Sequence, residues 1–175
     1  MAQTTLIFLF LLGSYYLFFL KPQLTLPNKL NSVEKTLSEH HTTLLQNRLG
    51  FFELTKLDPN SANFNIEKSN LVGTLQKTNK EGLEAIDKAQ DIPNIDKELS
   101  KRYKELLSET RKVYETQNKL LEKVFATNSY EAGVKVLKSE EAVLLLTSQT
   151  NLLLEYNFWL ERINKSRAQL TQQNQ

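Results

Sequence analysis

The pattern of apolar and polar positions divides the chain into an uncharged N-terminal run and a long polar body with helical periodicity. Residues 5–20 read TLIFLFLLGSYYLFFL, and Lys21 and Pro22 follow directly. As a helix this run rises about 24 Å, and with the preceding residues and a snorkelling Lys21 it reaches the length needed to span a bilayer. We therefore expect residues 1–21 to form an N-terminal transmembrane helix that stays uncleaved. The residues expected to contact lipid are Leu6, Ile7, Phe8, Leu9, Phe10, Leu11, Leu12, Tyr15, Tyr16, Leu17, Phe18, Phe19 and Leu20.

Two other interpretations of this run are a cleaved signal peptide and a buried helix of a soluble protein. A signal peptide has a positive n-region and small residues before its cleavage site. Residues 1–4 contain no Lys or Arg, and residues 19–23, FLKPQ, offer no pair of small residues. The retained anchor is therefore the favoured interpretation, and it predicts a single-pass membrane protein.

The orientation of the body depends on opposing signals. Lys21, Lys29 and Lys35 lie close behind the run, and by the positive-inside rule they would keep the body in the cytoplasm. A short anchor at the start of a chain commonly exports the rest of the chain, and a chain without Cys fits an oxidising compartment without requiring one. We expect an extracytoplasmic body, against the lysine rule.

The body carries apolar residues at helical spacing and few turn residues. After a linker at residues 22–27, the periodicity predicts helices over residues 28–57, 65–89, 95–125 and 129–170, separated by breaks at residues 58–61 and 91–94. Short connections force neighbouring helices to be antiparallel. The predicted fold is therefore all-α: a transmembrane helix, then an antiparallel bundle of about four helices with coiled-coil-like packing over residues 28–170, and a disordered tail at 171–175.

Heptad spacing marks the predicted seam of the first and third bundle helices. The seam residues are Leu30, Val33, Leu37, His40, Leu44, Asn47, Phe51 and Leu54 in the first, and Leu99, Tyr103, Leu106, Thr110, Val113, Gln117, Leu120 and Val124 in the third. The polar members His40 and Asn47 are interpreted as residues that fix the register of packed helices. A sharper alternative makes His40 a pH sensor, because imidazole titrates near neutrality.

The last predicted helix is the most apolar part of the body. Residues 142–160 contain a single charged residue, Glu155, and are too polar at 147–151 for a second membrane span, so we expect a buried central helix. Glu155 either points outward or lines a small pocket. Because this helix has more apolar surface than one stripe requires, part of it is a candidate docking face for another protein or a second copy. The candidate interaction or pocket residues are Leu145, Leu152, Glu155, Tyr156 and Trp159.

Composition and motifs give no indication of catalysis or of metal, cofactor or nucleic-acid binding. The 175 residues carry 22 basic and 20 acidic side chains, a net charge of +2 that attracts nucleic acid weakly. His40 and His41 point about 100° apart on a helix, and no Glu-x-x-His or HExxH motif accompanies them. No phosphate loop, GxSxG or Cys nucleophile is present. We expect no metal, cofactor, nucleic-acid partner or enzymatic activity.

The favoured function is a single-pass membrane-anchored helical scaffold or protein-interaction subunit, whose partners are the bilayer and either another protein or a second copy. The alternative is a membrane-tethered ligand-binding bundle with a pocket near Glu155, Tyr156 and Trp159. In architecture alone, the layout is similar to the membrane-tethered four-helix sensor modules of bacterial receptors.

Overall fold

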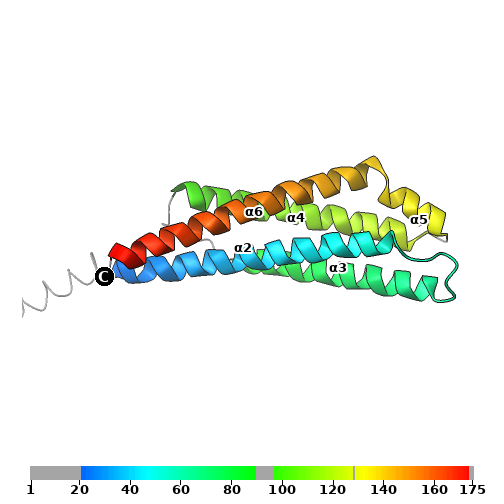
Figure 1. The fold of residues 1–175 in the computed structure, drawn as a ribbon, viewed down its shortest axis with the longest axis horizontal. Helices are drawn as coiled ribbons and strands as arrows, with labels where there is room; N and C mark the ends of the chain where they lie inside the picture. Colours follow the sequence, from blue (N-terminus) through cyan, green and yellow to red (C-terminus); the bar gives the residue numbers. More distant parts are fainter. Residues whose placement is uncertain (1–20, 90–96, 128, 174–175) are drawn as a thin grey trace, which may run out of the picture.

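The computed structural model describes residues 21–89, 97–127 and 129–173, and this part of the chain is all-α (Figure 1). The helices are α2 (Lys21–Leu54), α3 (Phe64–Lys88), α4 (Lys97–Phe125), α5 (Tyr130–Leu137) and α6 (Glu140–Gln173). The predicted transmembrane helix lies outside the described residues. None of the helices within the described ranges is long and apolar enough to cross a membrane.

Helices α2, α3, α4 and α6 run alternately along one long axis and form a four-helix bundle (Figure 1). Helix α2 packs beside α3 and α6, and α4 packs beside the same two helices, so α2 and α4 occupy opposite corners. The short helix α5 packs mainly on α4 at one end of the bundle. The predicted antiparallel helical bundle is confirmed in the described residues.

The core consists of the heptad positions that the sequence marks. Leu37, Leu44 and Leu106 are fully buried, and so are the polar seam residues Asn47 and Thr110. Burying an aliphatic side chain contributes about 1.5–3 kcal/mol, so the seams supply most of the drive to pack helices that would be marginal alone. The predicted seam of both helices is confirmed.

The predicted ends of two helices need correction. Helix α2 already includes residues 22–27, which were expected to form a linker. Pro27 removes one backbone donor, a cost of about 3 kcal/mol that the long buried seam behind it offsets. At the other end, α6 continues through residues 171–173, which were assigned to a disordered tail; residues 174–175 lie outside the described part.

The single helix predicted over residues 129–170 is in fact two helices, with a break at residues 138 and 139. Ser139 Oγ accepts a hydrogen bond from the Ala142 amide at 3.3 Å, as an N-cap does, and Glu140 and Glu141 follow in the first turn of α6. Acidic residues there are stabilised by the helix dipole. The Ser-Glu-Glu signal was present in the sequence, but the continuous apolar periodicity on both sides concealed it.

Candidate functional site

Three of the five residues predicted to form an interaction site or pocket line one groove, and the other two lie elsewhere. Tyr156 and Trp159 are buried in the bundle core, and Leu145 and Leu152 are buried beneath a groove. Glu155 is the exception, because its carboxylate is partly exposed and lies at the rim of that groove. Glu155 therefore does not share this groove with Tyr156 or Trp159.

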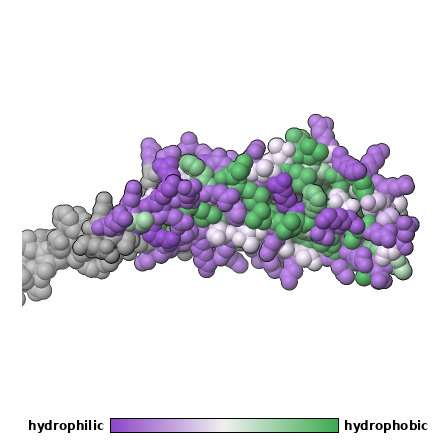
Figure 2. All heavy atoms as spheres, viewed as in Figure 1, coloured by the Kyte–Doolittle hydropathy of each residue, from purple (hydrophilic) through white to green (hydrophobic). Residues whose placement is uncertain are grey.

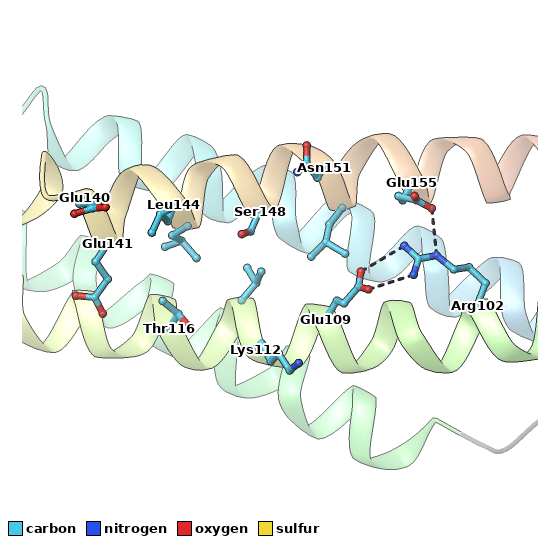
Figure 3. Close-up of a pocket in the computed structure, with 13 residues that line it drawn as sticks. Arg102, Glu109, Lys112, Thr116, Glu140, Glu141, Leu144, Ser148, Asn151 and Glu155 are labelled. Atoms are coloured by element: carbon cyan, nitrogen blue, oxygen red, sulfur yellow. Dashed lines mark hydrogen bonds and ion pairs between the residues drawn. The ribbon is translucent and has the colours of Figure 1, made fainter.

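The groove runs between α4 and α6 and has a volume of about 690 Å³ (Figure 3). Arg102 closes one end by joining the two helices. Its Nε lies 3.3 Å from Glu155 Oε2, and its Nη1 lies 3.0 Å from Glu105 Oε2 and 3.2 Å from Glu109 Oε1. A single guanidinium thus holds three carboxylates, which is the planar, multidentate pairing that Arg supports and Lys does not.

The rest of the groove has an apolar floor and an acidic rim. Val113, Leu145 and Leu152 form the floor, while Thr116, Ser148 and Asn151 lie along the middle. Glu140 and Glu141 lie at the far end, where Glu141 pairs with Lys123. The charged lining residues are Arg102, Lys112, Glu109, Glu140, Glu141 and Glu155, a formal balance of −2. Such a groove favours a cationic or amphipathic ligand over an anionic one.

A layer of buried amides crosses the bundle core and takes side chains from all four long helices. Asn47 donates to Asn79 at 2.7 Å, and Asn79 donates to Asn118 at 2.8 Å. In the same layer, Gln149 donates to Gln117 at 3.4 Å. Three of these groups have no hydrogen-bond partner among the described residues: Asn47 Oδ1, Gln117 Nε2 and Gln149 Oε1. Because buried amides are costly when unpaired, the layer favours one register of the helices over shifted ones.

A second polar cluster joins opposite corners of the bundle. His40 Nδ1 lies 3.2 Å from the Tyr114 hydroxyl, and the Thr110 and Tyr156 hydroxyls lie 2.6 Å apart. Burial lowers the pKa of His40 to about 4 and raises the pKa of Tyr114 and of Tyr156. These groups are therefore neutral at pH 7. The pH-sensor hypothesis for His40 loses support, because its titration has moved away from neutrality.

Large apolar side chains are exposed to solvent along the junction of α2 and α6. These side chains, which we call the α2–α6 face, are a stripe on α2 and two separate residues on α6: Leu45, Leu49 and Phe52 on α2, and Val143 and Leu154 on α6. Between 41% and 66% of each side chain is exposed. Arg48 Nη1 donates to Thr150 Oγ1 at 3.0 Å and holds α2 and α6 side by side within this face. Figure 2 shows apolar residues gathered along this side of the bundle.

Charge is nearly absent from the same stretch. Residues 40–52 of α2 contain one charged side chain, the half-buried Arg48, and residues 142–154 of α6 contain none. Helices α3 and α4 instead alternate Lys, Arg, Glu and Asp along their outer sides. A docking face was expected on the last helix, but its predicted residues do not include Val143 or Leu154, and no residue of α2 was expected in it. The missed signal was the i, i+4, i+7 spacing of Leu45, Leu49 and Phe52 outside the seam.

Comparisons with known proteins add no family to this description: no protein family, curated protein or solved structure gives a significant match to the chain. Within the described ranges, no group of His, Asp and Glu side chains has an arrangement that could hold a metal ion. The α2–α6 face and the α4–α6 groove are thus the two surfaces from which a function can be argued.

Proposed function

We propose that this protein is a non-catalytic scaffold, anchored in a membrane by residues 1–21, which binds another polypeptide through the α2–α6 face. The observation that carries the proposal is the face itself. Monomeric proteins seldom expose several large apolar side chains along two neighbouring helices with almost no charge among them, because burying such side chains against a partner is favourable by about 25 cal/mol per Å². Here that surface coexists with a fully formed core, so it is not needed for the fold.

The anchor is tested by comparing the full chain with a chain that lacks residues 2–20. We expect the full chain to remain with membranes through alkaline extraction and the shortened chain to be released. Because the protein has no Cys, a single Thr74→Cys substitution on the exposed side of α3 also reports topology. A membrane-impermeant maleimide should label it in intact cells if the body is extracytoplasmic. Labelling only after lysis would place the body in the cytoplasm instead.

Docking is tested by placing a photo-crosslinking residue at Leu49 in the full chain. Leu144 is the matched control, because it is also an exposed Leu but lies on the α4 side of α6. We expect a discrete crosslinked polypeptide from position 49 and none from position 144. Equal crosslinking from both positions would mean that the α2–α6 face has no special role.

The α4–α6 groove gives a reason to keep the ligand-binding, sensor-like bundle as a second candidate. Glu155 contributes to its rim, and the acidic balance of the lining favours an amphiphilic cation. Such a ligand should raise the melting temperature of the full chain, and Glu155→Gln should reduce that rise. A scaffold without a ligand site would show no rise with any compound of this class.

A further inference from the structure

We infer that the partner of the α2–α6 face is a second copy of this chain, packed face to face about a twofold axis parallel to the long axis of the bundle. This inference rests on the proposed scaffold function and names the partner. Under this symmetry, α2 of one copy lies against α6 of the other. Helix α2 then packs antiparallel to α6 between the two copies, as it does within each bundle.

The apolar side chains match in this arrangement because they lie at the same heights. The bond between Arg48 and Thr150 sets the register of α2 against α6. Counting residues from it places Leu45 level with Leu154, and Phe52 within about one helical turn of Val143. A parallel twofold axis preserves heights along the bundle, so Leu45 and Phe52 of one copy meet apolar side chains of α6 in the other, and Leu49 lies at a height between these two contacts. A shifted or inverted pairing would lose some of these matches.

The charges at both ends of the face are complementary in the same pairing. At one end, the exposed Lys56 follows the last residue of α2 and pairs with Glu53 at 3.7 Å. It lies within about one turn of the height of Glu140 on α6. At the other end, the exposed Lys35 of α2 lies within about one turn of the height of Glu161 on α6. Lys35 and Lys56, which each pair with a glutamate of their own chain, therefore also face an anion of α6 in the second copy, twice at each end of the symmetric contact. A partner of one dominant charge would not match both ends.

The size of the contact is adequate for a specific dimer. From Lys35 to Leu54, the last residue of α2, the helix rises about 29 Å, and two adjacent helices are about 20 Å wide. Two copies would bury on the order of 1,100 Å², just above the roughly 1,000 Å² expected of a specific interface. Because the axis is parallel to the bundle, residue 21 lies at the same end in both copies, so both predicted anchors can enter one membrane. Confinement there would raise the effective concentration and strengthen a modest contact.

Sedimentation of the full chain in detergent, over about 1–100 µM, tests the inference. We expect a monomer–dimer equilibrium. Leu49→Asp should weaken the dimer by roughly ten- to a hundredfold without lowering the melting temperature, because Leu49 is 66% exposed and a carboxylate would be buried without a partner. Leu144→Asp, at 60% exposure on the other side of α6, should leave the dimer intact. A monomer throughout, or a dimer broken only by Leu144→Asp, would overturn the inference.

Disulfide trapping then tests the symmetry, since the chain has no Cys of its own. Mixing Leu45→Cys chains with Leu154→Cys chains should give a mixed disulfide on oxidation, whereas Thr74→Cys chains should not couple. Leu49→Cys chains that link to themselves instead would indicate an antiparallel pair and contradict the proposed axis. If the chain is monomeric while photo-crosslinking at Leu49 captures a different protein, the scaffold function survives and the second copy is excluded.

Discussion

Replacing Gly82 by Ala should destabilise the bundle, although the same change normally stabilises a helix. Gly82 is buried on α3, and a Cβ added there would lie 2.5 Å from Tyr114 Cε2 and 2.9 Å from Tyr114 Cζ. Carbon atoms in contact are normally about 3.5–4.0 Å apart. The ring cannot withdraw easily, because Tyr114 is fully buried and its hydroxyl lies 3.2 Å from His40 Nδ1.

The expected change in the free energy of unfolding is the sum of one stabilising and two destabilising contributions. Ala is favoured over Gly in a helix interior by about 1 kcal/mol. Overpacking a core costs about 1–3 kcal/mol, and disturbing the hydrogen bond between His40 and Tyr114 costs about 1 kcal/mol more. We expect Gly82→Ala to lower the free energy of unfolding by roughly 1–3 kcal/mol. In a chain of this size, the midpoint of thermal unfolding should fall by about 2–4 °C for each kcal/mol.

Gly73 on the same helix is the matched control. A Cβ there would meet no atom within 4 Å, so Gly73→Ala should raise the free energy of unfolding by about 0.5–1 kcal/mol. The measurement is urea unfolding of both full-length variants, followed by circular dichroism. If Gly82→Ala stabilised the protein as much as Gly73→Ala, the close packing of Tyr114 on α3 would be refuted.

Three further predictions concern polar groups. The His40 pKa of about 4 lies below its usual value of 6.5, so the free energy of unfolding should be highest above about pH 6.5 and fall by up to about 3 kcal/mol as the pH drops to 4. Urea unfolding midpoints measured across this range should show the fall. The control variant His41→Gln should show the same fall. Replacing Gln117 and Gln149 together by Leu should leave the free energy of unfolding unchanged or raise it by about 1–2 kcal/mol. Gln149→Leu alone should lower it, because the buried Gln117 amide then loses its hydrogen-bond partner. Equal losses from the single and the double variant would contradict this. Arg102→Met should cost about 1–2 kcal/mol in low salt and less at 1 M salt in thermal unfolding, and an effect independent of salt would show that the carboxylates around it are not held by charge.

Most of the fold could be predicted because it depends on local spacing. The seam of α2 is a strict heptad from Leu30 to Phe51, and burial of one face is all that such a pattern needs to specify a helix. The seam also located His40 and Asn47 inside the core. The break at Ser139 was missed because a cap of about 1 kcal/mol is a weaker signal than apolar periodicity extending across it.

The candidate surfaces were harder to predict because they depend on which helices become neighbours. Tyr114 meets His40 across 74 residues of sequence, and Arg48 meets Thr150 across 102. Periodicity assigns a residue to a face of its own helix and does not say which helix covers that face. Tyr156 and Trp159 were therefore placed beside Glu155 in a pocket, although their side chains turn into the core while the carboxylate turns out.

The pairing of the first and last long helices has a consequence for how the protein is made. The α2–α6 face combines residues near position 49 with residues near position 150, so neither half of the surface is complete until the C-terminal helix docks. Arg167 completes that docking by bonding Glu34, which was synthesised 133 residues earlier. An unfinished or truncated chain therefore cannot present the assembled surface, and association through it would select for molecules whose synthesis and folding have both been completed.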